Sequence, residues 1–148
     1  MATIEIREAT TPEHVLVCDS VLRTFGRSCY GHGVPARLLL SKVEALLASP
    51  RWRVSVATLP EVPDEVCGFL LWRPEPIGLG WLQVKEPYRN RGVAKALLAS
   101  ALTHVPHGGI PCAFIIPEAA KLAAGKGLTL RYRPYLPDCE AYDLERAR

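Results

Sequence analysis

The sequence predicts a single α/β domain over residues 1–148, built on one mixed sheet of about six to seven strands with helices on both faces. Three observations predict it. Short stretches in which apolar and polar residues alternate are typical of strands, and stretches with apolar residues at helical spacing are typical of helices. The two kinds of stretch alternate along the chain. Its length suits one domain with a buried core.

The first strand and the first helix are expected near the N-terminus. Residues 4–7 alternate and suit a strand. Thr11-Pro12-Glu13 predicts a helix start, because a hydroxyl can cap a helix and proline fits its first turn. The helix is expected to end at Gly26. Its apolar positions are Val15, Cys18, Leu22 and Phe25.

A second helix follows a glycine-rich loop at residues 27–33. Pro35 opens this helix, and Ser49-Pro50 ends it. Its apolar stripe consists of Leu39, Val43 and Leu46. The spacing predicts that the stripe packs on the sheet.

The apolar period then changes to two, which predicts strands. Trp52, Val54 and Val56 share one face of the first strand of this group. Residues 59–65 carry two prolines and predict a hairpin connection. Two further strands are expected over residues 66–72 and 79–84.

The C-terminal half repeats the alternation of helix and strand. YRNRGVAKALLASAL, residues 88–102, predicts a long helix that ends before a proline at position 106. CAFII, residues 112–116, is fully apolar and bounded by prolines, so it suits a central strand. A short helix over residues 118–124 and a last strand over residues 129–132 follow.

The composition argues against several classes of function. A net charge of +3 permits an anionic ligand but does not demand nucleic acid. Apolar runs are too short for a membrane span. The N-terminus carries charges where a signal peptide would be apolar, so we expect a cytoplasmic protein. The five cysteines lack metal-binding spacing, and we expect buried free thiols and no metal site.

The stretch YRNRGVAKALL, residues 88–98, carries the main functional signal. A strand that runs into a helix here would direct the first free N–H groups of the helix at an anion. Gly92 would let a ligand approach the backbone. Arg89, Arg91 and Lys95 add positive charge, and a pyrophosphate is the natural ligand. The alternative is a solvated basic turn. The spacing matches neither a P-loop nor the dinucleotide-binding fingerprint.

A known family shares this stretch. V-x-x-P-x-x-R-x-x-G-x-A, which runs here from Val84 to Ala94, resembles the acyl-CoA signature of the GNAT superfamily of N-acyltransferases. Arg89, Gly92 and Ala94 match the core [QR]-x-x-G-x-[GA] of that signature. The order of predicted strands and helices also resembles the family. The resemblance implies a GNAT fold, in which the fourth and fifth strands splay apart.

The resemblance also implies a co-substrate, acetyl-CoA or another acyl-CoA. In the family the loop amides hold the pyrophosphate, and the preceding strand pairs with the pantetheine arm. An amide at Trp81 or Leu82 would polarise the thioester. The implied binding residues are Leu82, Gln83, Val84, Arg89, Asn90, Arg91, Gly92, Val93, Ala94 and Lys95.

The catalytic groups are less clear, because the chain departs from the family here. The tyrosine that many relatives use as a general acid falls on Ala123. A thiolate leaving group, with a pKa of about 8.5, needs little acid help, but an amine of pKa about 10.4 needs a base or desolvation. Glu75 and Glu118 are the nearest candidate bases, with ordinary surface carboxylates as the alternative.

The acceptor is expected to be a small-molecule or peptide amine. In the family the loop between the first two helices lines the acceptor site, which here would place Arg27, Tyr30 and His32 near it. The alternative is a loop that only covers the core. Two other functions stay open: a non-catalytic CoA-binding module, and a nucleic-acid-directed acyltransferase. An edge strand near the C-terminus could support a homodimer.

Overall fold

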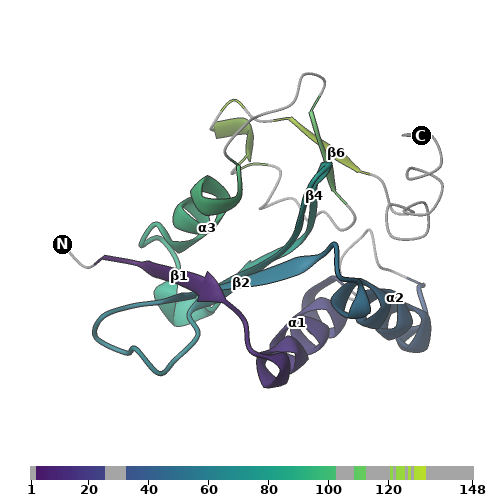
Figure 1. Ribbon diagram of the computed structural model, residues 1–148, viewed down its shortest axis with the longest axis horizontal. Helices are drawn as coiled ribbons and strands as arrows, with labels where there is room; N and C mark the ends of the chain where they lie inside the picture. Colours follow the sequence, from purple (N-terminus) through teal and green to yellow (C-terminus); the bar gives the residue numbers. More distant parts are fainter. Residues whose placement is uncertain are drawn as a thin grey trace.

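The described residues form one six-stranded mixed sheet in the order β1-β2-β3-β4-β5-β6 (Figure 1). The computed structural model describes residues 3–25, 33–102, 109–112, 121, 123–125, 127 and 129–132. The strands are β1 (Glu5–Glu8), β2 (Arg53–Thr58), β3 (Gly68–Pro74), β4 (Ile77–Val84), β5 (Ile110–Cys112) and β6 (Leu130–Tyr132). The first four pair antiparallel, and β5 and β6 add in parallel. This sheet confirms the predicted fold class.

Helices cover both faces of the sheet, as predicted (Figure 1). On one face lie α1 (His14–Ser20) and α2 (Ala36–Ala48). On the other lies α3 (Val93–Ala101). The short turn η1 (Thr11–Glu13) precedes α1, and the wider π-helical turn η2 (Val21–Phe25) continues it. Such π turns often occur at functional sites.

Among the described residues, the sheet divides the core into two clusters. On the α1 and α2 face, Leu39, Val43 and Leu46 pack with Trp52, Val54 and Val56, which confirms both predicted stripes. The cluster on the α3 face consists of Ala57, Leu70, Leu79, Val93, Leu97, Leu98, Ala101, Ile110 and Cys112. Cys67 is a buried free thiol and Cys18 is a half-buried one, and Cys112 is also buried. Each helix is therefore fixed by its own apolar face.

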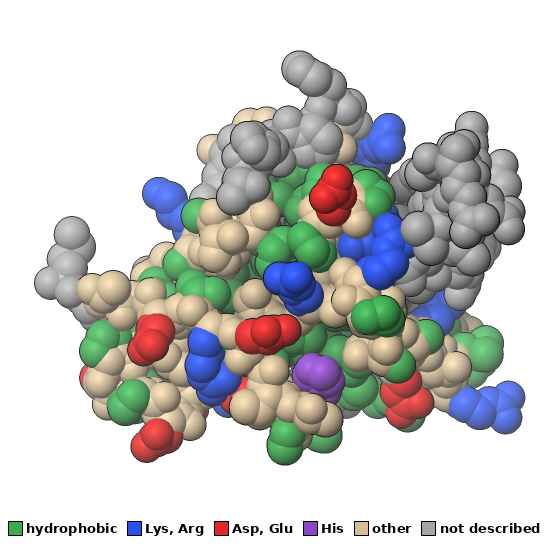
Figure 2. Space-filling model, in the orientation of Figure 1, with side chains coloured by type: hydrophobic (Ala, Val, Ile, Leu, Met, Phe, Trp, Pro, Cys, Tyr) green, Lys and Arg blue, Asp and Glu red, His purple; other side chains and the backbone are tan. Residues whose placement is uncertain are grey.

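The surface carries charges of both signs. On the face shown in Figure 2, acidic and basic side chains of the described residues are interspersed with apolar and polar ones. No helix of the described residues is long and apolar enough to cross a membrane. Among these residues no group of three or more His, Cys, Asp or Glu side chains could hold a metal ion.

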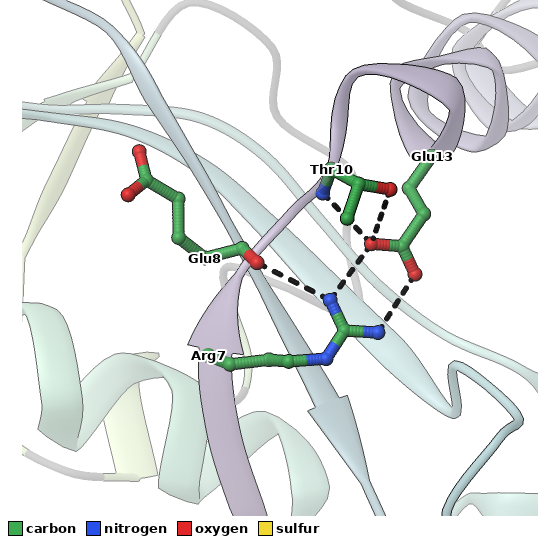
Figure 3. A network of polar contacts seen from close by, with 4 residues as sticks. All are labelled: Arg7, Glu8, Thr10 and Glu13. Atoms are coloured by element: carbon green, nitrogen blue, oxygen red, sulfur yellow. Dashed lines mark hydrogen bonds and ion pairs between the residues drawn. The ribbon is translucent and has the colours of Figure 1, made fainter.

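Several predicted boundaries need correction. The first helical turn is capped at Thr10, not Thr11: the Thr10 N–H and hydroxyl donate to Glu13 Oε1 at 2.8 and 3.0 Å (Figure 3). The third helix begins at Val93, not at residue 88. The fifth strand already begins at Ile110, and the rest of its predicted range, residues 113–116, lies outside the described residues.

An irregularity in β4 lies between its two halves. Leu71 of β3 faces Trp81 of β4, whereas Trp72 faces Leu79, so Gly80 is an extra residue without a partner on β3. A Cβ at Gly80 would lie 2.8 Å from Cγ of Leu71. Only glycine fits this bulge without displacing Leu71. Bulges redirect the local backbone and often lie next to active sites.

Candidate coenzyme-binding turn and strand

The turn between β4 and α3 has two left-handed residues. After Lys85 and the short turn η3 (Glu86–Tyr88), Asn90 has φ 64° and Gly92 has φ 84°. Asparagine and glycine tolerate this region best. The helical repeat cannot pass through such residues, which explains why α3 begins only at Val93. A turn of this kind brings successive backbone N–H groups into a concave, anion-binding arrangement.

The backbone N–H groups of residues 90–95 are available to a ligand. The first helical hydrogen bond is donated by Ala96 to the carbonyl of Gly92, at 3.0 Å. None of the N–H groups of residues 90–95 donates to an acceptor within the described part of the chain. Together with the positive end of the α3 dipole, they form a candidate anion site. The turn thus brings together the residues predicted from Asn90 to Lys95.

The positive side chains of this turn differ in their partners. Arg89 folds back along β4, where its Nε donates to the carbonyl of Val84 at 3.1 Å. Arg91 forms an ion pair with Glu61 of the β2–β3 turn. Lys95 is exposed in the first turn of α3, which contains no acidic residue. A cation at a helix N-terminus is unfavourable unless an anion lies nearby, so its place there points to an anionic ligand.

In the part of the chain that the structure describes, the second half of β4 has an edge without a partner strand. Within the described residues, β4 pairs with β5 only where Leu79 faces Cys112. The segment that follows, Leu82 to Val84, has no partner on that side among these residues. An extended chain can bind such an edge through main-chain hydrogen bonds. The predicted binding residues of β4 and those of the turn therefore lie along one continuous path.

Sequence reasoning missed a polar cluster on the sheet face that α1 and α2 cover. The indole N–H of Trp81 donates to the hydroxyl of Ser20 at 3.0 Å, and that hydroxyl donates to Oε1 of Gln83 at 3.2 Å. Ser20 is the last residue of α1, just before the π turn. Its position between buried Val17 and Val21 was the available signal for an inward-facing hydroxyl.

The predicted catalytic carboxylates lie elsewhere or outside the described residues. Glu75 is exposed in the β3–β4 turn, at the end of β4 opposite to Val84. An eight-residue strand spans about 25 Å, so Glu75 does not share the end where the anion site lies. Glu118 lies outside the described residues, as do the predicted acceptor residues Arg27, Tyr30 and His32. Ala123, at the family's tyrosine position, is helical and 2 % exposed.

Comparison with solved structures identifies the fold. The chain is similar to a possible acetyltransferase from Clostridium difficile 630, with 18 % identity over 85 % of this chain and 90 % of that one and a TM-score of 0.57. It is also similar to an acetyltransferase from Thermus thermophilus, with 18 % identity over 84 % and 86 % of the two chains and a TM-score of 0.53.

A third similar structure is a GCN5-related glucosamine N-acetyltransferase region of a fungal multi-domain β-N-acetylglucosaminidase. The identity is 15 % over 86 % of this chain and 17 % of that one, with a TM-score of 0.55. No protein-family model and no curated protein sequence matches the chain. At these identities the likeness concerns the fold. The chain has the GNAT fold, which confirms the predicted architecture.

Proposed function

We propose that the protein is an acyl-CoA-dependent N-acyltransferase, in the simplest case an acetyltransferase. The observation that carries the proposal is the run of backbone N–H groups over residues 90–95 that have no acceptor among the described residues, in the turn that follows a strand edge without a described partner. A diphosphate bound to an extended arm matches both features. The GNAT fold supports the same ligand.

Each part of the site has a separate task in this proposal. The amides of residues 90–95 hold the pyrophosphate of acetyl-CoA or another acyl-CoA, and Lys95 adds charge. Leu82, Gln83 and Val84 bind the pantetheine arm through their backbone. The carbonyl of Val84 already accepts a hydrogen bond from Arg89. This bond fixes Arg89 beside the point where the arm would meet the diphosphate.

The bulge at Gly80 supports the expected place of the chemistry. It redirects the backbone just before Trp81 and Leu82, whose amides are the expected donors to the thioester carbonyl. An amide aimed at that oxygen would stabilise the negative charge that develops there when an amine attacks directly in a ternary complex. The Ser20 hydroxyl fixes the side chains of Trp81 and Gln83 on the face covered by α1 and α2.

The acceptor is proposed as a small-molecule or peptide amine that approaches from the α1 and α2 face. Its deprotonation costs about 4–5 kcal/mol at pH 7 for an amine with a pKa of about 10.4. Glu75 is not part of this proposal because it lies at the other end of β4. Glu118 as a base, the acceptor residues Arg27, Tyr30 and His32, a homodimer and a cytoplasmic location stay predictions.

Calorimetry with acetyl-CoA and CoA tests the proposal. Wild-type protein should bind both, and Gly92→Glu should abolish binding, because a carboxylate beside the amides repels the diphosphate. Gly33→Glu is the matched control, since Gly33 also has a positive φ and open space around it. Absence of binding at high micromolar CoA, or binding that Gly92→Glu leaves unchanged, would overturn the proposal.

Thiol release separates the enzyme from the alternatives. Acetyl-CoA turnover over a panel of small amines and peptides supports an acyltransferase, whereas CoA binding without turnover supports the non-catalytic module. Buried Ala123 in place of the family's tyrosine keeps that alternative open. Salt-sensitive binding of RNA or DNA would instead favour the nucleic-acid-directed acyltransferase.

A further inference from the structure

The β2–β3 turn, residues 59–66, contacts the β4–α3 turn through two carboxylates. Glu61 forms an ion pair and hydrogen bond with Arg91. Glu65 accepts a hydrogen bond of 2.6 Å from the hydroxyl of Tyr88 and lies 4.0 Å from Nζ of Lys85. Two carboxylates thus reach three side chains that flank the candidate anion site. Carboxylates beside an anion site need an explanation, because they repel the ligand.

We propose that Glu61 and Glu65 are positioning residues of the coenzyme A site, which hold the β4–α3 turn in its binding conformation. The inference rests on the proposed function and assigns it two residues outside the binding loop. These carboxylates would not touch the ligand. They would act through Arg91 and Tyr88, whose side chains they fix from the neighbouring turn.

The turn needs such support from Asn90 onward, because its own backbone hydrogen bonds end at Arg89, whose N–H donates to the carbonyl of Glu86 at 3.2 Å. The base of the turn is fixed where the Lys85 N–H donates to the carbonyl of Cys67 at 2.9 Å. Farther along, Asn90 adopts a left-handed conformation that costs energy for a residue with a side chain. The N–H groups of residues 90–95 have no acceptor among the described residues. Side-chain contacts at Tyr88 and Arg91 therefore restrain the segment on both sides of Asn90.

The protonation states of Glu61 and Tyr88 maintain these two contacts at neutral pH. Glu61 accepts hydrogen bonds from its own backbone and from Arg91. Both lower the pKa of Glu61, so this carboxylate stays charged at neutral pH. The hydrogen bond to Glu65 raises the pKa of Tyr88 to about 12, which keeps its hydroxyl a donor. A turn held in advance loses less conformational freedom when a ligand binds, and binds more tightly for that reason.

The opposite interpretation makes the opposite prediction. If Glu61 and Glu65 only occupied the basic side chains in competition with phosphate, their neutralisation would tighten CoA binding. If they position the turn, their neutralisation weakens binding although it removes repulsion. The sign of the change in the dissociation constant therefore decides between the two.

Glu61→Gln, Glu65→Gln and the double variant are the test, with Asp64→Asn as the matched control. Asp64 is exposed in the same turn, carries the same charge and makes no hydrogen bond or ion pair to another described residue. We expect the CoA dissociation constant to rise about three-fold for each single glutamine variant and about ten-fold for the double variant. These changes correspond to the free energies that exposed ion pairs contribute. Asp64→Asn should leave it unchanged or slightly lower.

A split of the kinetic constants distinguishes positioning from loss of folding. The glutamine variants should raise KM for acetyl-CoA and leave kcat unchanged. Glutamine variants that bind CoA as tightly as Asp64→Asn, or more tightly, would overturn the inference.

If the wild type binds no CoA, the proposed function fails, but ¹⁵N relaxation of residues 89–92 still tests the restraint. Order parameters equal in all variants would then reject it.

Discussion

Gly68 of β3 packs directly against Val93, the first residue of α3. A Cβ at position 68 would be 2.9 Å from Cγ1 of Val93 and 2.9 Å from the carbonyl oxygen of Gln83. Real Cβ atoms do not come so close to either kind of atom, so only glycine lets the start of α3 rest on the sheet. Because the amides of residues 93–95, which are part of the candidate anion site, belong to the same first turn, this contact also sets their distance from β4.

Gly68→Ala should therefore lower both stability and CoA affinity. Overpacking of this kind costs about 1–3 kcal/mol of unfolding free energy. Gly68→Ala/Val93→Ala should cost less than the two single changes added together, because the second change removes one of the two clashes. Denaturant unfolding and calorimetry measure both effects. Gly125→Ala is the control: helical Gly125 has nothing within 4 Å of its Cβ position. Strict additivity in the double variant would contradict the proposed contact.

Gly92 is required for its backbone conformation and not for space. Its Cβ position meets only Cδ1 of Ile4, at 4.0 Å, but its φ is +84°. Gly92→Ala should cost about 1–2 kcal/mol of unfolding free energy and weaken CoA binding, because α3 would start differently. Gly92→Asn should cost less, since asparagine tolerates this region.

Gly33→Ala isolates the effect on binding. Gly33 has φ +83° and open space around it, so the cost in stability should match that of Gly92→Ala. Its CoA affinity should stay at the wild-type value. An equal loss of affinity in both variants would mean that the change in binding reflects stability alone.

Periodicity alone was sufficient to predict the layers of the fold. The stripe of Leu39, Val43 and Leu46 and the alternation from Trp52 to Val56 each encode which face is buried. This pattern is local, so it can be read without the structure. The start of α3 was predicted too early, because an alanine- and leucine-rich stretch looks helical whatever precedes it. Asn90 and Gly92, two residues that tolerate a left-handed backbone, were the available signal.

The site was less predictable because its parts come from distant segments. Ser20 reaches Trp81 and Gln83 only through the packing of α1 on the sheet, and no local pattern encodes that distance. Glu75 was proposed because it precedes the predicted coenzyme-binding strand in sequence. The antiparallel β3–β4 pair instead places it at the far end of that strand.

The ion pair between Arg7 and Glu13 makes stability depend on acidic pH. Arg7 donates to both carboxylate oxygens at 2.7 and 2.9 Å (Figure 3), and these bonds together with those from Thr10 lower the pKa of Glu13 to about 2. Because the folded pKa lies below the ordinary value of about 4.5, this contribution is complete above pH 4.5. It is lost as the pH falls from 4.5 towards 2.

Glu13→Gln should remove that part of the pH dependence. The side chain of Arg7 is 41 % exposed, so screening limits the loss at pH 7 to about 1 kcal/mol of unfolding free energy. Denaturant unfolding at pH values from 7 to about 3 measures it. Glu8→Gln is the control, because Glu8 joins the network only through its backbone carbonyl, 3.2 Å from Arg7 Nη1. A pH dependence in Glu13→Gln that is as steep as in the wild type, or steeper, would contradict the role of this pair.

Lys95 should show opposite effects on stability and on binding. Its charge lies at the positive end of α3, where no acidic residue of the first turn compensates it. Lys95→Gln should therefore raise the unfolding free energy by about 0.3–1 kcal/mol. The same change should weaken CoA binding about three-fold or more and reduce its salt dependence, because the diphosphate loses a cation.

Arg37→Gln provides the matched control for Lys95. Arg37 is also an exposed cation in the first turn of a helix without acidic residues there, in this case α2. The stability gain should be similar, while CoA affinity and its salt dependence should not change. Stability and affinity that rise together in Lys95→Gln would mean that this lysine does not face the ligand, and the positive charge of the site would then have to come from Arg89.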